Sequence, residues 1–104
     1  MKKILLCCAA GMSTSMLVQR MNTEATKRDI EVDIQAVPAA EFEQRIQDAD
    51  VILLGPQVKY ELARFSAIAQ PFGKPVAVID MMDYGMQKGA AVLDFALSLI
   101  ENKN

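Results

Sequence analysis

The first third of the chain carries a strand-like, a helix-like and again a strand-like hydrophobic pattern. Residues 2–8 end in an almost unbroken apolar run, which predicts a strand buried on both faces. Apolar residues then recur at the spacing of one helix face: Leu17, Val18, Met21 and Ala25. In residues 31–37 the apolar residues Val32, Ile34 and Ala36 alternate with polar ones. This alternation predicts a strand with one solvated face, which is typical of a sheet edge.

The rest of the chain repeats the alternation of strand and helix. A short helix is expected after Pro38, with one apolar stripe: Phe42, Ile46 and Ala49. Residues 51–54 are apolar throughout, which predicts a central strand that Gly55-Pro56 ends. A third helix follows with its own stripe: Val58, Leu62, Phe65 and Ala69. Residues 76–79 predict a fourth strand, and a last helix carries a final stripe: Val92, Ala96, Leu99 and Ile100.

Repeated strand–helix units predict one α/β domain over residues 1–104, with a parallel sheet between two layers of helices. The two most apolar strands should be central, which gives the strand order 2-1-3-4. The fourth strand is too apolar for a bare edge, so we expect helices or a long loop to cover it. Ligands bind such sheets outside the carboxyl ends, where the strand order reverses. Cys8, the turn at 55–57 and the loop at 80–85 should therefore share one rim.

Composition excludes several classes of function. The net charge of −2 argues against nucleic-acid binding. No apolar run approaches the ~20 residues that cross a bilayer, so direct membrane insertion is not expected. The chain has no histidine, which excludes Ser-His and Cys-His catalytic pairs and argues against zinc. Two adjacent cysteines form no disulfide framework, so the cytoplasm is the expected compartment. We expect neither a metal nor a cofactor.

The segment after the first strand combines a thiol with small and hydroxyl residues. Cys8 ends the strand, and a run of such residues leads into the helix: Ala9, Ala10, Gly11, Met12, Ser13, Thr14 and Ser15. The first N–H groups of a helix lack internal partners and carry partial positive charge. Such a loop favours a bound anion and the thiolate form of a nearby cysteine. We interpret Cys8 as a nucleophile facing a phosphate-sized pocket. The hydroxyl residues at 13–15 could instead serve only as helix caps.

The two cysteines are expected to have different surroundings. Neighbouring strand residues point to opposite faces, and free cysteine is among the most buried residue types. We therefore interpret Cys7 as a core residue. The same geometry disfavours a disulfide between Cys7 and Cys8.

A positive charge is missing from the loop after Cys8. Phosphatases with a cysteine nucleophile use a Cys-x5-Arg loop, whose arginine binds the phosphoryl oxygens. Counting from Cys8, the arginine position holds Thr14. Without that cation the transition state of hydrolysis loses charge stabilisation. A phosphocysteine formed here should therefore persist and could be passed on.

Other residues of the rim allow more than one interpretation. Gln57 could donate hydrogen bonds to an anion or simply begin a helix. Tyr84 could pack over the pocket or contact a partner, whereas Asp83 is more simply part of a turn. Several methionines lie near the rim: Met12, Met16, Met81, Met82 and Met86. Their flexible side chains suit docking to more than one protein.

Three motifs together resemble the IIB component of bacterial sugar phosphotransferase systems, lactose/cellobiose type. They are Cys-Ala-Ala-Gly-Met-Ser-Thr-Ser at 8–15, Leu-Leu-Gly-Pro-Gln at 53–57 and Tyr-Gly at 84–85. The resemblance runs the full length. It implies a fold like that of low-molecular-weight tyrosine phosphatases and flavodoxin-like proteins. It also implies that Cys8 is phosphorylated, that the backbone of Ala9 to Thr14 holds the phosphoryl group, and that Gln57 and Tyr84 lie near it.

The same resemblance implies a phosphotransferase that works as a carrier. It would accept a phosphoryl group from phosphohistidine on a IIA protein and give it to a sugar bound by the membrane-embedded IIC transporter. The sugar implied is a β-linked disaccharide such as cellobiose, chitobiose or lactose. Two alternatives remain open from the residues alone. One is a small cysteine-dependent phosphatase, against which the missing arginine argues. The other is a non-enzymatic flavodoxin-like module that binds a flavin or nucleotide.

Overall fold

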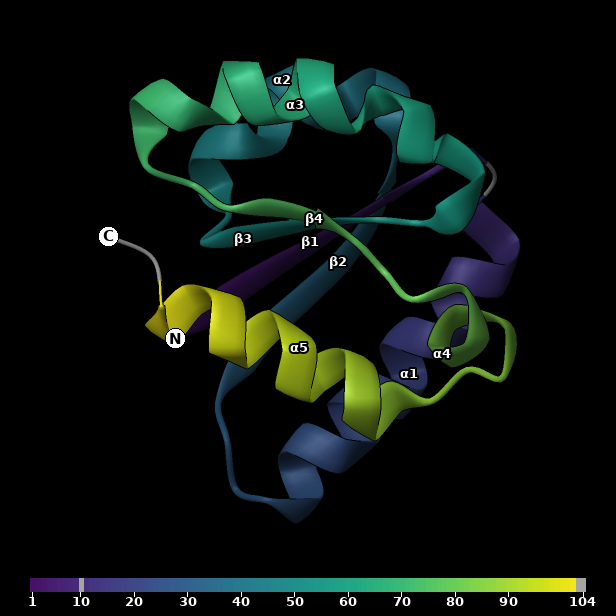
Figure 1. Ribbon diagram of the computed structural model, residues 1–104. Helices are drawn as coiled ribbons and strands as arrows, with labels where there is room; N and C mark the ends of the chain where they lie inside the picture. Colours follow the sequence, from purple (N-terminus) through teal and green to yellow (C-terminus); the bar gives the residue numbers. More distant parts are fainter. Residues whose placement is uncertain (10, 103–104) are drawn as a thin grey trace.

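The computed structural model describes residues 1–9 and 11–102, and of residues 11–13 it describes the backbone only. Its sheet has four parallel strands in the order β2-β1-β3-β4 (Figure 1). The strands are β1 Lys2–Cys8, β2 Val32–Pro38, β3 Val51–Leu54 and β4 Val76–Val78. The predicted parallel sheet and its strand order are confirmed.

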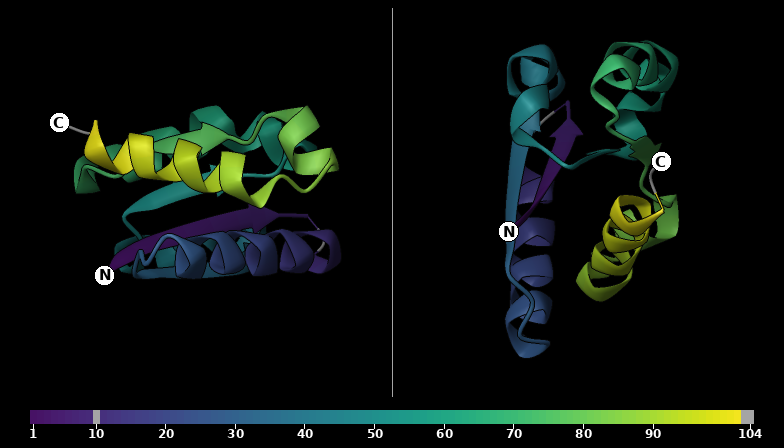
Figure 2. Two further views of the ribbon diagram at one scale, coloured as in Figure 1. Left: turned by 90° about the horizontal axis from the view of Figure 1, so that it is seen from below. Right: turned by 90° about the vertical axis from the view of Figure 1, so that its left-hand side faces the viewer.

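Helices cover both faces of the sheet, so the predicted three layers are present (Figures 1 and 2). One face carries α2 and α3, and the other carries α1 and α5. The α-helices are α1 Gly11–Lys27, α2 Phe42–Arg45, α3 Leu62–Ala69, α4 Met81–Gly85 and α5 Gly89–Glu101. Short 3₁₀ helices accompany them: η1 Ala39–Glu41, η2 Ile46–Asp48, η3 Pro56–Glu61 and η4 Gln70–Phe72.

The sheet separates two hydrophobic clusters, and alternation along β1 supplies both. Ile4 and Leu6 pack on the side of α1 and α5, whereas Leu5 and Cys7 pack on the side of α2 and α3. The predicted stripe of the first helix is buried: Leu17, Met21 and Ala25. On the opposite face Phe42 stacks on Phe65 with ring centroids 3.9 Å apart and ring planes inclined by 6°.

Two helices differ from the sequence prediction. The segment at 80–85, expected as a loop with a turn at Asp83, forms the short helix α4 after its first residue. Its first turn is stable because Asp80 Oδ2 accepts the N–H groups of Met82 and Asp83 at 3.0 and 3.1 Å. In α5 the buried apolar side chains are Val92, Leu93 and Ala96. Leu99 and Ile100, which were expected to belong to the buried stripe, are half-buried.

Candidate active site

The rim predicted from the sequence exists where the strand order reverses, between β1 and β3. Cys8 is the last residue of β1, and α1 begins at Gly11 just beyond it. The Gly55 N–H, directly after β3, donates to the carbonyl of Cys7 at 2.9 Å. A Cβ placed on Gly55 would lie 3.6 Å from the Cβ of Cys8. The thiol-bearing residue therefore lies against the end of β3 and beside the start of α1.

Cys8 is 0% exposed in this structure. The Cys8 side chain is therefore closed off from solvent in this structure, and a phosphoryl donor can react with it only after it becomes accessible. The loop residue Ala10 lies outside the described residues, as do the side chains of residues 11–13. Met12 and Ser13, predicted as rim or phosphate-binding residues, are therefore placed by their backbone alone. Ala9 and Ser15 are exposed.

Cys7 is a core thiol, as its interpretation required. It belongs to the cluster that contains Phe42 and Phe65. Burial, followed by the charge of neighbouring Cys8, raises the pKa of Cys7 to about 12, while the Arg45 charge acts in the opposite direction. Cys7 therefore stays protonated at neutral pH and is no nucleophile there.

A hydrogen-bonded chain links three predicted site residues that are far apart in the sequence. Thr14, in the first turns of α1, is 1% exposed. Its Oγ1 lies 3.0 Å from the Tyr84 hydroxyl of α4. That hydroxyl also accepts a hydrogen bond from Gln57 Nε2 of η3 at 2.9 Å. The chain Thr14–Tyr84–Gln57 thus ties the start of the helix after Cys8 to the segments that follow β3 and β4.

The remaining rim residues have simpler roles. Asp80 caps α4, and Asp83 is part of that helix. Four of the predicted methionines have exposed side chains: Met16, Met81, Met82 and Met86. Among the described residues no group of histidine, cysteine, aspartate or glutamate side chains could hold a metal ion. Within the same residues no helix is long and apolar enough to cross a bilayer.

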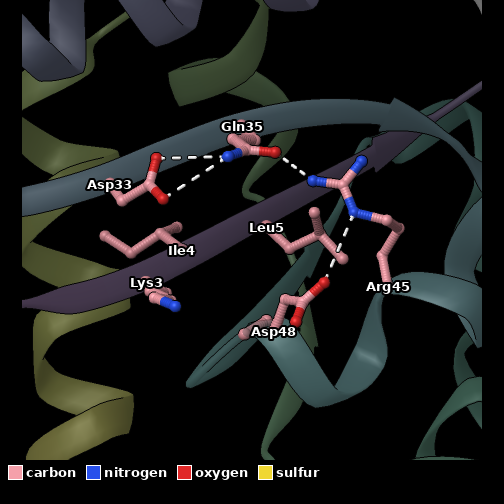
Figure 3. A pocket seen from close by; sticks show the side chains of 8 residues that line it. Lys3, Ile4, Leu5, Asp33, Gln35, Arg45 and Asp48 are labelled. Atoms are coloured by element: carbon pink, nitrogen blue, oxygen red, sulfur yellow. Dashed lines mark hydrogen bonds and ion pairs between the residues drawn. The ribbon is translucent and has the colours of Figure 1, made fainter.

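A small polar pocket lies at the opposite end of the sheet, near the start of β1 (Figure 3). Its volume is about 140 Å³, and three of its four charged side chains, Asp33, Arg45 and Asp48, contact another lining residue. Arg45 donates to Gln35 and lies 3.9 Å from Asp48, while Gln35 donates to Asp33 at 3.3 Å. This pocket shares no lining residue with the Cys8 rim.

Residues 3–95 match the family "PTS system, Lactose/Cellobiose specific IIB subunit". The chain belongs to this family. It is 41% identical over 103 residues to the oligo-beta-mannoside-specific EIIB component of Bacillus subtilis, covering 99% of this chain and 100% of that protein. It is 39% identical over 104 residues to the cellobiose-specific EIIB component of Lactococcus lactis, covering 95% of this chain and 96% of the other.

Solved structures agree. The cellobiose-specific IIB component of Borrelia burgdorferi superposes with a TM-score of 0.83 at 39% identity, over 99% of this chain and 94% of that one. The lactose-specific IIB domain of Streptococcus pneumoniae has a TM-score of 0.85 at 21% identity, over 94% and 96% of the two chains. At that identity the likeness shows the fold alone. As a IIB subunit, the chain is a component of a sugar phosphotransferase.

Sequence reasoning named Thr14, Tyr84 and Gln57 separately but missed that they bond to one another. No local pattern encodes a contact between residues 14 and 84, because it depends on where α4 packs. The cap of α4 did have a signal, since an aspartate directly before helix-forming residues is a common N-cap.

Proposed function

We propose that this IIB subunit carries a phosphoryl group on Cys8. The Cys8 thiolate attacks the phosphorus of a phosphohistidine on a IIA protein, so an S–P bond forms as the N–P bond breaks. A hydroxyl of a sugar bound by the IIC transporter then attacks the same phosphorus. The S–P bond breaks, the thiolate is regenerated and the hydroxyl proton is released. Thiolate is suited to both steps because it is a good nucleophile and a good leaving group.

The observation that carries this proposal is the position of Cys8 at the end of β1, just before the start of α1, where the first N–H groups of a helix have no intrahelical partner. The chain has no histidine that could carry the group instead. In the proposal the backbone N–H groups of residues 9–15 hold the phosphoryl oxygens. Gln57 and Tyr84 act indirectly, because they hold Thr14 and with it the first turns of α1.

Burial of Cys8 adds a requirement to this mechanism. A thiol that is 0% exposed must become accessible before its sulfur can react in line with a phosphoryl donor. We propose that the docked partner stabilises a state in which Cys8 is accessible, and that both partners approach the rim formed by α1, α4 and η3. Their contacts with this subunit should then exclude each other.

The sugar proposed is a β-linked disaccharide, such as cellobiose, chitobiose or lactose, and the transfer is proposed to occur in the cytoplasm. Three relatives bear names specific for oligo-β-mannoside, galactose and cellobiose, at 39–41% identity to this chain. These differing names support the idea that sugar choice lies mainly in the transporter.

The test is reconstitution with phosphoenolpyruvate, the general phosphotransferase proteins and a cognate IIA, followed by mass spectrometry of the intact protein and its peptides. We expect one phosphoryl group on Cys8. It should be absent from Cys8→Ser and retained in Cys7→Ser, which is the matched control. A phosphoryl group that survives Cys8→Ser, or that maps to another residue, contradicts the proposal.

The same preparation tests the alternatives. Rapid hydrolysis of p-nitrophenyl phosphate that is lost in Cys8→Ser would favour the phosphatase. Tight flavin binding that survives Cys8→Ser would favour the binding module. Adding the missing arginine as Thr14→Arg is a poor test, because Thr14 is 1% exposed and bonded to Tyr84. A guanidinium there would disturb the packing as well as the charge.

A further inference from the structure

The outer side of β4 carries unpaired backbone groups. β4 is an edge strand, and in Figure 1 it lies nearest the viewer with α3 on one side and α5 on the other. Ile52 N–H donates to the Pro75 carbonyl at 3.0 Å, and Ile79 N–H donates to the Leu54 carbonyl at 2.9 Å. With Leu53 opposite Ala77, residues 75, 77 and 79 therefore face β3. The N–H and C=O groups of Val76 and Val78 point outward, and no described residue bonds to them.

The edge formed by β4 is uncharged along the strand and hollowed near both of its ends. Val76, Ala77 and Val78 are half-buried and uncharged, although exposed edges are usually guarded by charge. A hollow of about 470 Å³ lies beside the start of the strand, lined in part by Lys74 and Val76. A second hollow of about 260 Å³ lies beside its end, lined in part by Val78 and Asp80.

Charges of opposite sign flank the strand. Lys74 precedes β4 and forms no ion pair with a described residue, whereas Asp80 follows β4 and is exposed. Asp80 caps α4 through Oδ2, which accepts the N–H groups of Met82 and Asp83. In an antiparallel pair of two such strands, the start of each lies beside the end of the other. The edge is therefore complementary to itself.

We propose that this edge pairs with β4 of a second copy of the chain, antiparallel and centred on Ala77. Val76 then lies opposite Val78 of the second copy. The outward N–H of each of these residues donates to the outward C=O of the other. Lys74 lies opposite Asp80 of the second copy. The contact is isologous, so each ion pair and each backbone pair occurs twice. The two sheets join into one sheet of eight strands.

This arrangement leaves the active sites separate. Because the two copies run antiparallel, the carboxyl ends of their strands point in opposite directions, and so do their Cys8 rims. The inference does not depend on the proposed phosphoryl transfer. Pairing through so short a strand makes a small interface, so we expect a weak dimer that dissociates on dilution.

Sedimentation equilibrium of the whole chain tests the association. We expect the mean mass to rise with concentration from 11.4 kDa toward twice that value. Lys74→Glu places like charges together at both ends of the pair and should weaken association about tenfold. Lys59→Glu is the matched control, since it changes the net charge equally at an exposed residue outside β4. Monomer alone at millimolar concentration, or equal effects of the two variants, would overturn the proposal.

Cysteine cross-linking tests the register. Residues at position 77 face each other across the two-fold axis at a Cα separation of about 4.5 Å, within disulfide reach. Ala77→Cys should therefore form a covalent dimer under copper phenanthroline and air. Val76→Cys alone should not, whereas an equimolar mixture of Val76→Cys and Val78→Cys should. The wild type, whose two cysteines are buried, controls for other disulfides. A dimer that gives any other pattern uses a different surface, and the proposal is then wrong.

Discussion

The hydroxyl of Tyr84 offers the sharpest test of how the active-site rim is held together. It bonds to Thr14 Oγ1 at 3.0 Å and accepts from Gln57 Nε2 at 2.9 Å. Tyr84→Phe removes one oxygen and keeps the ring that packs against the core cluster. We expect this variant to fold and to be less stable.

The size of the effect follows from the burial of the two partners. Thr14 is 1% exposed, so its hydroxyl loses a partner where water does not readily replace it. Leaving a buried hydroxyl unsatisfied costs about 1–3 kcal/mol. Gln57 is exposed, and its amide can return to water at little cost. We expect a loss of about 1.5 kcal/mol, which in a chain of 104 residues lowers the melting temperature by roughly 7 °C.

Urea and thermal unfolding measure this loss, and the chain supplies its own control. Its one other tyrosine, Tyr60, is 76% exposed, so Tyr60→Phe should leave stability unchanged. A double-mutant cycle with Thr14→Val isolates the bond between the two hydroxyls. The double variant should lose less than the sum of the single losses, with a coupling of about 1 kcal/mol. If Tyr84→Phe is as stable as Tyr60→Phe, or if the stability losses of Tyr84→Phe and Thr14→Val simply add, the hydrogen bond between Tyr84 and Thr14 contributes nothing. Either result would refute the reasoning.

Three further predictions concern the packing around the site, all measured by urea unfolding. Gly89→Ala should lower the free energy of unfolding by about 1–3 kcal/mol, because the added Cβ would lie 2.6 Å from the backbone carbonyl carbon of Arg20. Gly85→Ala is the control and should leave that free energy unchanged, because its Cβ would have no atom within 4 Å. Phe65→Ala should cost about 3–5 kcal/mol through loss of the ring stack with Phe42, whereas Phe72→Ala, at an exposed ring, should cost far less. Because Cys7 has a pKa of about 12 when folded and ionises near 9.0 when unfolded, its contribution to stability is complete below about pH 9 and declines as the pH rises toward 12. Cys7→Ala should therefore lose less stability than the wild type between about pH 8 and about pH 10, and equal losses would contradict the raised pKa.

Hydrophobic spacing along the chain was enough to predict the four strands, their order and the helices that cover them. It also separated Cys7 from Cys8, because alternation along a strand is a local property. The position of Cys8 before a helix start needed only the run at 8–15, and the family resemblance rests on the same motif. These features depend on residues close together in the sequence, so a single sequence carries them.

Tertiary structure alone decided the rest. The bonds from Tyr84 to Thr14 and Gln57 join segments 70 and 27 residues apart, and no periodicity encodes such contacts. Cys8 is also fully buried in the structure, where the sequence suggested an open pocket. The five-residue helix α4 is too short to be stable by propensity, so it depends on the Asp80 cap and its neighbours. The outward groups of β4 were likewise invisible, because register between strands determines which backbone groups remain unpaired.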